Sequence, residues 1–385
     1  MMHPKQFQRS KVFTISFAHF AHDVYTSFLA PLLPLLIEKL GISLSTGALL
    51  NITTRIPSLF NPFFGLMAEK TGVKYFVILT PAMTAVSMSL IGLAPSLGLL
   101  FILLFVTGIS TALFHVPSPT MIKESSGDRT GTGMSYFMVG GELARTVGPL
   151  LVTAGVSWWG LEGIYRLMPL GLLASLILYI KLKDFDTDRP IQKPKEKGDG
   201  KKLLYRYRYF FLTMGGFLFF QAGMKSALTL FLPVYLTQQG ASLWYAGISL
   251  SLLQFFGILG TSLSGNISDR IGRRAMLLIG SIGAAISMGF FAMSSNIFLL
   301  IPLGIFLFTS GPVLMATVQD TDSNMPTFMN SIYMTINFAL SSLVVFAVGL
   351  MGDTLGLDQT YLICSVFAIG CIPMAYILTS NSKTT

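Results

Sequence analysis

Charged residues are scarce in this sequence of 385 residues. Asp, Glu, Lys and Arg together make up 11% of it, whereas hydrophobic residues make up 52%. Soluble globular proteins carry about 25% charged residues, so the composition excludes a water-soluble enzyme or binding domain. The net charge of +9 does not indicate nucleic-acid binding, because so apolar a chain belongs in a lipid bilayer. The sequence predicts a polytopic integral membrane protein.

Cysteine is nearly absent, and the few histidines form no regular pattern along the chain. Cys364 and Cys371 are the two cysteines. On a helix they would lie about 10 Å apart along the axis, too far for a disulfide. The four histidines show no spacing typical of metal ligands. We therefore expect no bound metal and no cofactor.

Twelve apolar segments follow one another, each long enough to cross a bilayer as a helix of about 20 residues. The first six are expected at roughly 12–38, 44–68, 74–94, 97–122, 130–157 and 162–182. The second six are expected at roughly 208–237, 242–267, 275–294, 296–319, 326–352 and 358–379. The sequence thus predicts an all-α membrane protein with a six-helix bundle over 1–182, a cytoplasmic linker over 183–207 and a second six-helix bundle over 208–385.

Basic residues are distributed unevenly over the connections between these segments. If the N-terminus is cytoplasmic, 21 of the 26 Lys and Arg residues fall in cytoplasmic segments, two in outer loops and three inside helices. Cytoplasmic loops of membrane proteins carry such an excess of basic residues. We therefore expect both termini on the cytoplasmic side of the plasma (inner) membrane, an uncleaved first helix and membrane lipid as a partner.

The two halves of the chain repeat each other. Four residues near the end of the first helix of each half recur at an offset of 199. They are Ser27, Pro34, Gly41 and Ser43 in the first half and Ser226, Pro233, Gly240 and Ser242 in the second. Residues 65–74 and 265–274 also align, at an offset of 200, with two glycines, an acid and basic residues at the same spacing. This pattern predicts an internal duplication.

The second copy of this connection matches a known loop motif. Residues 265–274 read GNISDRIGRR, which agrees with the G-x-x-x-D-R-x-G-R-R motif of the major facilitator superfamily at every specified position. The first copy departs from the motif at Glu69, Lys70 and Val73. The chain resembles this superfamily over its whole length, which implies transport by alternating access. The residues expected to form an electrostatic latch that gates it are Gly65, Glu69, Lys70, Gly72, Gly265, Asp269, Arg270, Gly272, Arg273 and Arg274.

Within the superfamily, the chain is similar to the fosmidomycin-resistance type of transporter. Three stretches carry this similarity: HFAHDVYTSFLAPLLP at 19–34, FHVPSP at 114–119 and MSYFMVGGELARTVGP at 134–149. The resemblance implies a proton-coupled exporter. Gly148-Pro149 matches the core of the helix-5 motif of drug antiporters, although Ala144, Val152 and Thr153 stand where its outer glycines belong.

Ionisable side chains inside the expected helices mark the candidate site. A charged side chain at mid-bilayer costs about 2.5–3.5 kcal/mol, so these groups should face a polar cavity or one another. The residues expected to exchange protons are Asp23, Glu142, His19, His22 and His115. The residues expected to contact substrate are Arg145, Lys225, Arg55, Tyr25, Tyr136, Phe137, Gln254 and Asn337.

Helical spacing predicts which of these groups meet. His19 and Asp23 are four residues apart and share a helix face, whereas His22 is expected to point about 100° away. Glu142 and Arg145 are three apart and can pair. His115 precedes two prolines, so a hinge or structural role is the alternative to proton exchange. The alternative for the charges is a purely structural role, in which they only neutralise one another and hold the helices in register.

Two basic residues suggest what is carried. Lys225 aligns with Thr26 in the repeat, one turn from the position of Asp23. If Lys225 and Arg145 both face the cavity, a carboxylate or phosphonate can engage both of them. Alternatively, Lys225 pairs with Asp23 and Arg145 with Glu142, so that neither base is free. In a third version, protons neutralise the acids and release the bases for substrate.

We therefore expect a secondary active transporter, working as a monomer, that moves a small anionic or zwitterionic solute in exchange for protons. An importer of a small nutrient remains the alternative to an exporter. A membrane enzyme or a non-transporting sensor is disfavoured, because the sequence shows no nucleophile–base pair or metal cluster. It also lacks the G-x-x-x-x-G-K-[ST] loop of ATP-driven pumps. We expect no enzymatic activity and no nucleic-acid partner.

Overall fold

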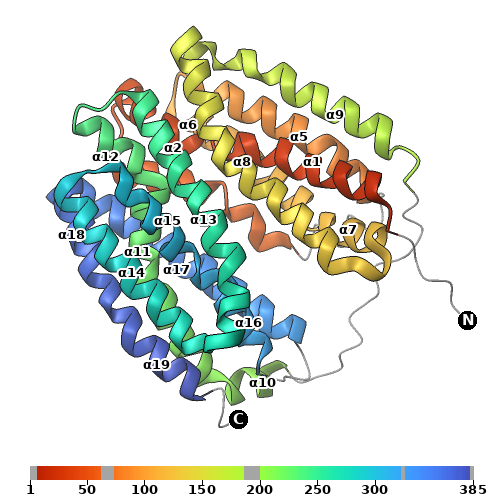
Figure 1. The fold of residues 1–385 in the computed structure, drawn as a ribbon. Helices are drawn as coiled ribbons and strands as arrows, with labels where there is room; N and C mark the ends of the chain where they lie inside the picture. Colours follow the sequence, from red (N-terminus) through yellow and green to blue (C-terminus); the bar gives the residue numbers. More distant parts are fainter. Residues whose placement is uncertain (1–6, 62–72, 186–199, 322–325, 382–385) are drawn as a thin grey trace, which may run out of the picture. The chain divides into compact units, whose positions relative to one another are not determined.

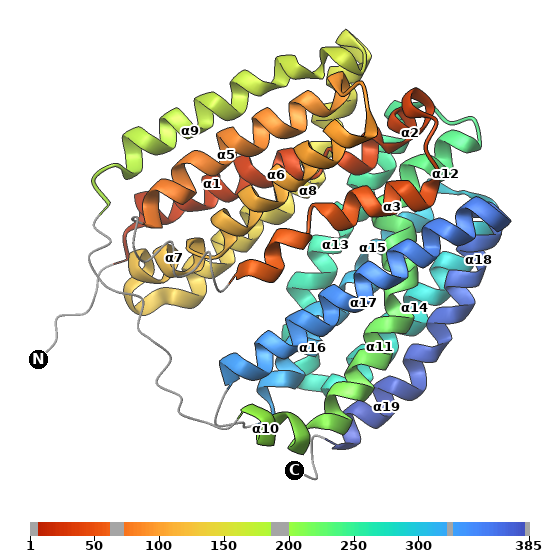
Figure 2. The ribbon, with the colours of Figure 1, turned by 180° about the vertical axis from the view of Figure 1, so that it is seen from behind.

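The computed structural model describes residues 7–61, 73–185, 200–321 and 326–381. Within these ranges the regular elements are helices, and they form two compact units (Figures 1 and 2). The first unit comprises 1–42, 49–193 and 241–251, and the second comprises 43–48, 194–240 and 252–385. Ten helical segments in the described ranges are long and apolar enough to cross a membrane. The predicted all-α membrane fold is confirmed, whereas the predicted domain boundaries stay a prediction.

The first half of the chain supplies eight labelled helices. They are α1 (Arg9–Thr26), α2 (Leu29–Leu40), α3 (Leu44–Thr53), α5 (Val73–Leu90), α6 (Leu97–His115), α7 (Ser118–Ser126), α8 (Thr130–Trp159) and α9 (Met168–Leu182). A short 3-10 turn, Ile56–Phe60, follows α3. In the first unit α1 packs against α8 and α5, and α5 in turn packs against α6 and α9 (Figure 1). The helix pair α1 and α8 positions the candidate site.

The second half of the chain supplies the remaining helices. They are α10 (Gly200–Arg206), α11 (Arg208–Ser226), α12 (Leu232–Gln238), α13 (Leu243–Ile271), α14 (Arg273–Ser294), α15 (Leu300–Phe308), α16 (Ser310–Gln319), α17 (Pro326–Leu355), α18 (Leu357–Phe367) and α19 (Cys371–Asn381). In the second unit α11 packs against α17 and α19, and α14 packs against α15 and α18 (Figure 2). Each unit has its own apolar core of buried side chains.

The first membrane helix of each half changes course at the same place in the repeat. In the first half, α1 ends at Thr26 and α2 begins at Leu29. Pro31 lacks the amide hydrogen that would bond the carbonyl four residues earlier, which weakens the helix here. In the second half, a π-helical turn over Ala227–Phe231 separates α11 from α12, which contains Pro233. Both helices therefore depart from regular α-helix at corresponding positions of the repeat, residues 27–28 and 227–231.

The turn after each of these helices is also duplicated in its backbone conformation. Gly41 has φ +60° and Gly240 has φ +85°, a left-handed region that favours glycine. Two residues later, the hydroxyls of Ser43 and Ser242 each accept a hydrogen bond of 3.1 Å from the amide three residues further on. Such a hydroxyl caps the start of the next helix. This equivalence supports the predicted internal repeat.

Small residues on α8 allow it to lie close to α1. Gly140, Ala144 and Gly148 recur every four residues on one face of α8, and Ala144 is fully buried. A Cβ atom at Gly140 would overlap the carbonyl of Ser16, and one at Gly148 would overlap the hydroxyl of Ser27. Small residues spaced in this way let membrane helices approach closely. The side chains that follow the glycines on α8 can therefore reach α1.

The fourth membrane segment is interrupted where the sequence predicts it. The helix α6 ends at His115, and α7 begins at Ser118. Pro117 and Pro119 lack the amide hydrogens that would continue the helical ladder across this point. His115 is thus the last residue of α6, and its side chain projects next to a break in the helix.

Candidate functional site

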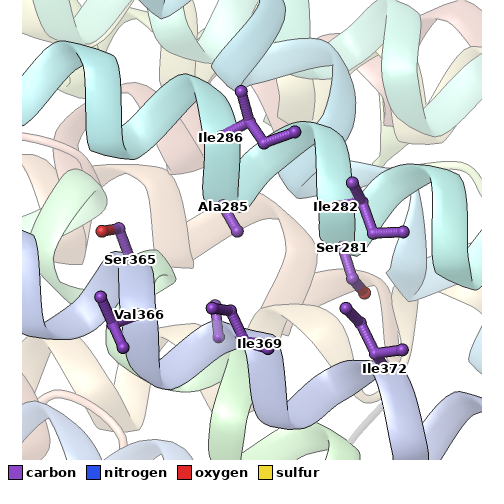
Figure 3. A pocket seen from close by; sticks show the side chains of 9 residues that line it. Ser281, Ile282, Ala285, Ile286, Ser365, Val366, Ile369 and Ile372 are labelled. Atoms are coloured by element: carbon purple, nitrogen blue, oxygen red, sulfur yellow. The ribbon is translucent and has the colours of Figure 1, made fainter.

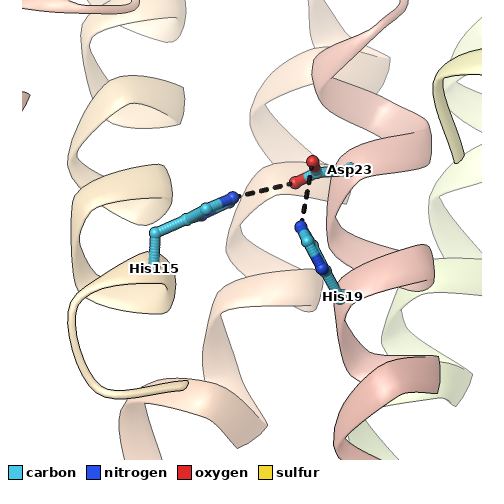
Figure 4. Close-up of side chains that lie close together, drawn as sticks. All are labelled: His19, Asp23 and His115. Carbon is cyan, nitrogen blue, oxygen red and sulfur yellow. Dashed lines mark ion pairs between the residues drawn. The ribbon is translucent and has the colours of Figure 1, made fainter. Parts of the chain in front are cut away.

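Asp23 on α1 lies at the centre of a cluster of ionisable side chains in the first unit. His19 Nε2 lies 3.3 Å from Asp23 Oδ2, as expected for residues four apart on a helix. From α6, His115 Nε2 lies 3.7 Å from Asp23 Oδ1, and Figure 4 shows this side chain reaching across to the carboxylate. From α8, Arg145 Nη2 lies 3.7 Å from Asp23 Oδ2. Three helices therefore converge on one carboxylate.

His22 also contacts this carboxylate, contrary to the direction expected from helix geometry alone. Its Nδ1 lies 2.8 Å from Asp23 Oδ1. Adjacent Cα–Cβ bonds on a helix do diverge, but the His22 side chain bends back toward its neighbour and stacks on Phe114, with ring centroids 4.6 Å apart. Since a carboxylate oxygen only accepts, His22 Nδ1 donates this hydrogen bond.

Backbone carbonyls fix the protonation of the ring nitrogens in His19 and His115. His19 Nδ1 lies 2.7 Å from the carbonyl oxygen of Phe137, and His115 Nδ1 lies 3.1 Å from that of Thr111. A carbonyl only accepts hydrogen bonds, so each Nδ1 carries a hydrogen. The neutral form of each ring then has its lone pair on Nε2. In both residues this lone pair faces the Asp23 carboxylate.

The predicted pair of Glu142 and Arg145 forms on α8. Arg145 Nη1 donates a hydrogen bond of 2.7 Å to Glu142 Oε1. The other terminal nitrogen of Arg145 is the one that approaches Asp23. One guanidinium thus contacts two carboxylates, and with neutral imidazoles the three groups Asp23, Glu142 and Arg145 carry one net negative charge.

Burial within the cluster increases from Arg145 toward Asp23. The side chain of Arg145 is 44% exposed and that of His115 is 37% exposed. Those of His19 and Asp23 are each 5% exposed, and that of His22 is fully buried. A solute or ion can therefore reach Arg145 and His115 directly, and Asp23 lies behind them. An uncompensated charge in such a place is costly unless a cation balances it.

The aromatic residues expected to contact substrate in the first unit differ in accessibility. Tyr25 is buried, and its hydroxyl donates to the carbonyl of Leu167 at 2.7 Å. Phe137 is buried and stacks on His19, with ring centroids 4.1 Å apart. Tyr136 is 38% exposed. Phe137 therefore supports His19 within the cluster, and Tyr136 remains the accessible aromatic residue of the three.

The other expected substrate contacts make no contact with the Asp23 carboxylate among those found in the described residues. Arg55 is exposed, follows the C-terminal end of α3 and lies near enough to Arg145 to interact with it electrostatically. In the second unit, Lys225 Nζ lies 5.7 Å from the ring centre of Phe308, and the Oε1 atom of Gln254 is buried without a hydrogen-bond partner. Asn337 Oδ1 accepts a long hydrogen bond of 3.4 Å from Ser341. Substrate contact at these residues stays a prediction.

The second copy of the gating motif forms a small ion-pair network. Arg273 Nη1 contacts Asp269 Oδ1 at 2.5 Å, and Arg273 Nε contacts Asp320 Oδ2 at 3.0 Å. Gly272 adopts φ +91° between α13 and α14, where a glycine is needed. Arg270 is exposed, and Arg274 lies over the ring of Tyr376.

The first copy of the motif, with Gly65, Glu69, Lys70 and Gly72, lies outside the described residues. Its gating role therefore stays a prediction, as does that of the second copy.

Two hollows in the second unit lack the chemistry of the Asp23 cluster. A pocket of about 190 Å³ between α14 and α18–α19 is lined by isoleucine, valine and alanine side chains with Ser281 and Ser365 (Figure 3). A larger hollow of about 660 Å³ between α11 and α17 is apolar apart from Arg208. Apolar surfaces of this kind suit lipid chains, so the Asp23 cluster is the stronger candidate site.

Sequence reasoning named the ionisable residues of the cluster but not its geometry. It predicted contacts within α1 and within α8, because spacing along one helix is readable from the sequence. The position of His115 beside Asp23, and the carbonyls of Phe137 and Thr111 that orient the rings, depend on how α1, α6 and α8 pack. A histidine before paired prolines in a membrane helix was the available signal for His115.

Comparison with known proteins agrees with this architecture. The family model described as Major Facilitator Superfamily matches residues 15–345. The Fosmidomycin resistance protein of Escherichia coli (strain K12) is 21% identical over 91% of this chain and 88% of its own length. The multi-drug resistance efflux pump PmrA of Streptococcus pneumoniae is 24% identical over 77% of this chain and 75% of its own length.

Solved structures show the same fold. A bacterial homologue of the human lysosomal transporter Spinster has a TM-score of 0.79 at 14% identity, covering 99% of this chain and 98% of that one. A variant of the nucleoside transporter NupG has a TM-score of 0.73 at 14% identity, covering 97% and 99% of the two chains. The family model spans most of the sequence, and the chain belongs to the major facilitator superfamily of membrane transporters.

Proposed function

We propose that this protein is a proton-coupled secondary transporter that exports a small anionic or zwitterionic solute by alternating access. The observation that carries the proposal is the buried Asp23 carboxylate, which three imidazoles and the Arg145 guanidinium surround within a membrane helix bundle. Ionisable residues inside membrane segments commonly form proton relays and substrate pathways.

The geometry of His19 supports proton exchange at this site. His19 Nε2 is buried and has no hydrogen-bond partner, although it lies 3.3 Å from Asp23 Oδ2. Two lone pairs facing each other at this distance repel, whereas one proton between them turns the contact into a charge-assisted hydrogen bond. The same proton also neutralises the charge left on the carboxylates. We infer that His19 and Asp23 share an exchangeable proton, with His22, His115 and Glu142 adjusting its affinity.

The geometry of Arg145 supports an anionic group on the substrate. Its guanidinium is half-exposed, and its two terminal nitrogens are directed to Glu142 and Asp23. When a proton neutralises Asp23, the Arg145 Nη2 atom is released for an anion, since a guanidinium binds carboxylates and phosphonates through two parallel hydrogen bonds. The relative that confers fosmidomycin resistance supports a phosphonate among the candidate substrates. Exposed Arg55 and Tyr136 are further candidate contacts.

The remaining features of the proposal follow from the family and from the relatives. Two relatives whose names indicate resistance support export rather than import. The bacterial relatives and the bias of basic residues support a place in the inner membrane with both termini cytoplasmic. We propose that the protein acts as a monomer, without a cofactor and without enzymatic activity.

Purified protein in proteoliposomes tests the coupling. Candidate solutes are fosmidomycin, simple carboxylates and zwitterionic amino acids, each screened with an imposed pH gradient and an internal pH-sensitive dye. We expect one class of solute to move against its own gradient and to dissipate the pH gradient as it does so. Reversal of the pH gradient should reverse the solute flux. Proton and solute movement in opposite directions indicates antiport, and movement in the same direction indicates symport.

The substitution Asp23→Asn is the decisive variant. We expect it to abolish gradient-driven transport and to preserve exchange of labelled for unlabelled solute, which needs no net proton movement. Asp358→Asn is the control, because Asp358 is exposed at the start of α18 and bonds Gln239 outside the cluster. Normal uphill transport by Asp23→Asn, with normal pH dependence, would remove Asp23 from the coupling mechanism.

A further inference from the structure

Three atoms of the kind that bind metal ions converge in the first unit. They are Nε2 of His19, Nε2 of His115 and a carboxylate oxygen of Asp23, and all lie within 4.8 Å of one another (Figure 4). His19 comes from α1 and His115 from α6, so the two rings approach the carboxylate from different helices. A tetrahedral ion with ligand bonds of about 2.0–2.2 Å separates its ligand atoms by roughly 3.3–3.6 Å. His19 Nε2 lies 3.3 Å from Asp23 Oδ2, within this range, and His115 Nε2 lies 3.7 Å from Asp23 Oδ1, just above it.

The hydrogen bonds behind the two rings are those of metal-binding histidines. A histidine that binds a metal through one nitrogen usually donates its other N–H to a backbone carbonyl or a carboxylate. His19 donates from Nδ1 to the carbonyl of Phe137, and His115 donates from Nδ1 to that of Thr111. Both Nε2 atoms are thereby oriented toward Asp23 as lone-pair donors. The buried Nε2 of His19 has no hydrogen-bond partner, so its lone pair is available to a cation.

His22 differs from the other two histidines in orientation. It uses Nδ1 to donate to Asp23 Oδ1, so its N–H occupies the side of the ring that faces the carboxylate. Its Nε2 is buried without a hydrogen-bond partner and does not belong to the converging set. His22 therefore positions the carboxylate and is not expected to be a ligand.

The charges around the cluster permit a cation. Arg145 approaches Asp23 at 3.7 Å, but its nearer partner is Glu142, at 2.7 Å, which offsets its charge. Arg55 adds positive charge next to Arg145, whereas the groups that contact Asp23 itself are imidazoles and the Arg145 guanidinium. The Asp23 carboxylate therefore remains as an anionic ligand for a bound ion. The side chain of His115 is 37% exposed, which gives an ion a route to the other two ligands.

We propose that His19, Asp23 and His115 bind a divalent transition metal ion such as Zn²⁺. Two imidazoles and one carboxylate are a ligand set used for zinc and for other first-row metals, and the remaining coordination position is left for water or substrate. The ion occupies the place of the shared proton, so metal and proton compete. The metal site does not depend on the proposed transport function, since it follows from the ligand geometry alone.

Metal binding to the purified full-length protein tests this site. The protein, with any affinity tag removed, is treated with a chelator in detergent and titrated with Co²⁺, and visible absorption reports coordination. Calorimetry with Zn²⁺ then gives the affinity and stoichiometry. We expect one ion per chain, and displacement of Co²⁺ by Zn²⁺ with loss of the absorption.

Matched histidine variants assign the ligands. His19→Gln and His115→Gln should each weaken Zn²⁺ binding more than the roughly 10–100-fold that loss of a supporting residue costs. His22→Gln, in the same cluster, should stay within that lower range and retain the Co²⁺ absorption. Size-exclusion profiles and thermal unfolding of each variant confirm that it is folded.

The outcomes separate the metal site from the transport function. Absence of binding by the wild type overturns the proposal. Equal binding by the folded His19→Gln/His115→Gln double variant means an adventitious ion only and also overturns it. Metal binding together with proton-independent transport supports the metal site and overturns the proposed coupling. Absence of metal binding together with proton-driven transport does the reverse.

Discussion

At the residue scale, the site depends on two backbone carbonyls as much as on the ionisable side chains. Phe137 and Thr111 contribute only their carbonyl oxygens, yet these oxygens decide which nitrogen of His19 and His115 carries a hydrogen. Both rings therefore direct Nε2 to Asp23. Without these hydrogen bonds, either ring could adopt the tautomer that donates an N–H to the carboxylate. That hydrogen bond would stabilise the carboxylate without a further cation.

The guanidinium of Arg145 cannot be replaced by another base. We expect Arg145→Lys to lower transport at least about tenfold, because one ammonium cannot reproduce two nitrogens directed to Glu142 and Asp23 at once. Transport and solute binding by the purified variant are measured alongside Arg166→Lys, where Arg166 lies outside the cluster beside Trp159. Equal affinities in wild type and Arg145→Lys would show that only charge matters at this position.

At the scale of the helix, the glycines of α8 allow the contact with α1. Gly140 and Gly148 face the backbone and small side chains of α1, and a Cβ atom at Gly141 would overlap the His19 imidazole. The same turn of α8 carries Glu142 and Arg145. The helix that supplies the charged pair therefore also supplies the space in which His19 lies.

This close packing predicts a position-dependent effect of adding a methyl group. Gly141→Ala should lower the free energy of unfolding by about 1–3 kcal/mol, the usual cost of overpacking, and should weaken proton coupling by displacing His19. Gly98→Ala is the matched control on α6, because a Cβ atom there meets nothing within 4 Å. We expect the thermal midpoint to fall for Gly141→Ala and to be unchanged or slightly higher for Gly98→Ala. Equal midpoints would contradict the close approach at Gly141.

The connection between α13 and α14 carries a network of ion pairs. Arg273 contacts both Asp269 and Asp320, and these groups are partly exposed. Exposed ion pairs contribute only about 0–1 kcal/mol to stability. The network therefore has little influence on whether the unit folds, and its effect is expected on the conformation of the loop.

We expect Asp269→Asn to slow transport about fivefold or more and to leave expression largely intact. A factor of about five is the lower end of typical coupling between sites. Arg273 keeps its contact with Asp320 in this variant, so the second unit should remain folded. Initial transport rates of equal amounts of purified protein give the result, with Asp358→Asn as a comparison. Unchanged rates would leave the motif without a gating role.

At the scale of the whole molecule, apolar side chains on the outer helices match a lipid environment. On α9, Leu170, Leu173, Leu176 and Ile180 are all exposed. Contiguous apolar surface of this kind is rare on water-soluble monomers. The exposed apolar surface, the scarcity of charge and the repeat of helical segments are consistent with one another.

Cysteine labelling tests the proposed orientation in the membrane. The native Cys364 and Cys371 are buried, so they give little background. Asp184 follows the end of α9, and we expect Asp184→Cys to react with a membrane-impermeant maleimide only after permeabilisation. Trp158 lies at the C-terminal end of α8, and we expect Trp158→Cys to react in intact cells. Asp184 and Trp158 are both exposed, so access to the reagent depends on the side of the membrane. The opposite pattern would invert the topology.

Features that depend on local order along the chain were predictable. The contact of His19 with Asp23 and the pair of Glu142 with Arg145 follow from helical spacing, and both are confirmed. The contact of His22 with Asp23 was not predictable, because the rotamer of a side chain depends on the groups that pack beside it. For His22 that group is the ring of Phe114. The repeat was readable because its glycines and serines serve the same local turn in each half.

The sequence by itself determined the class of protein and the order of its apolar segments, because hydropathy acts through local interactions with the bilayer, and its loop motif indicated the family. The expected helix at 44–68 ends at Thr53 and is followed by a 3-10 turn. Only the tertiary structure decided that His115 on α6 joins His19 and Asp23 on α1, and that Arg145 on α8 spans two carboxylates. Helical spacing predicts which residues share one face of a helix, but it does not predict which neighbouring helix packs against that face. That choice is made by close packing between helices, here by the small residues of α8 that admit α1.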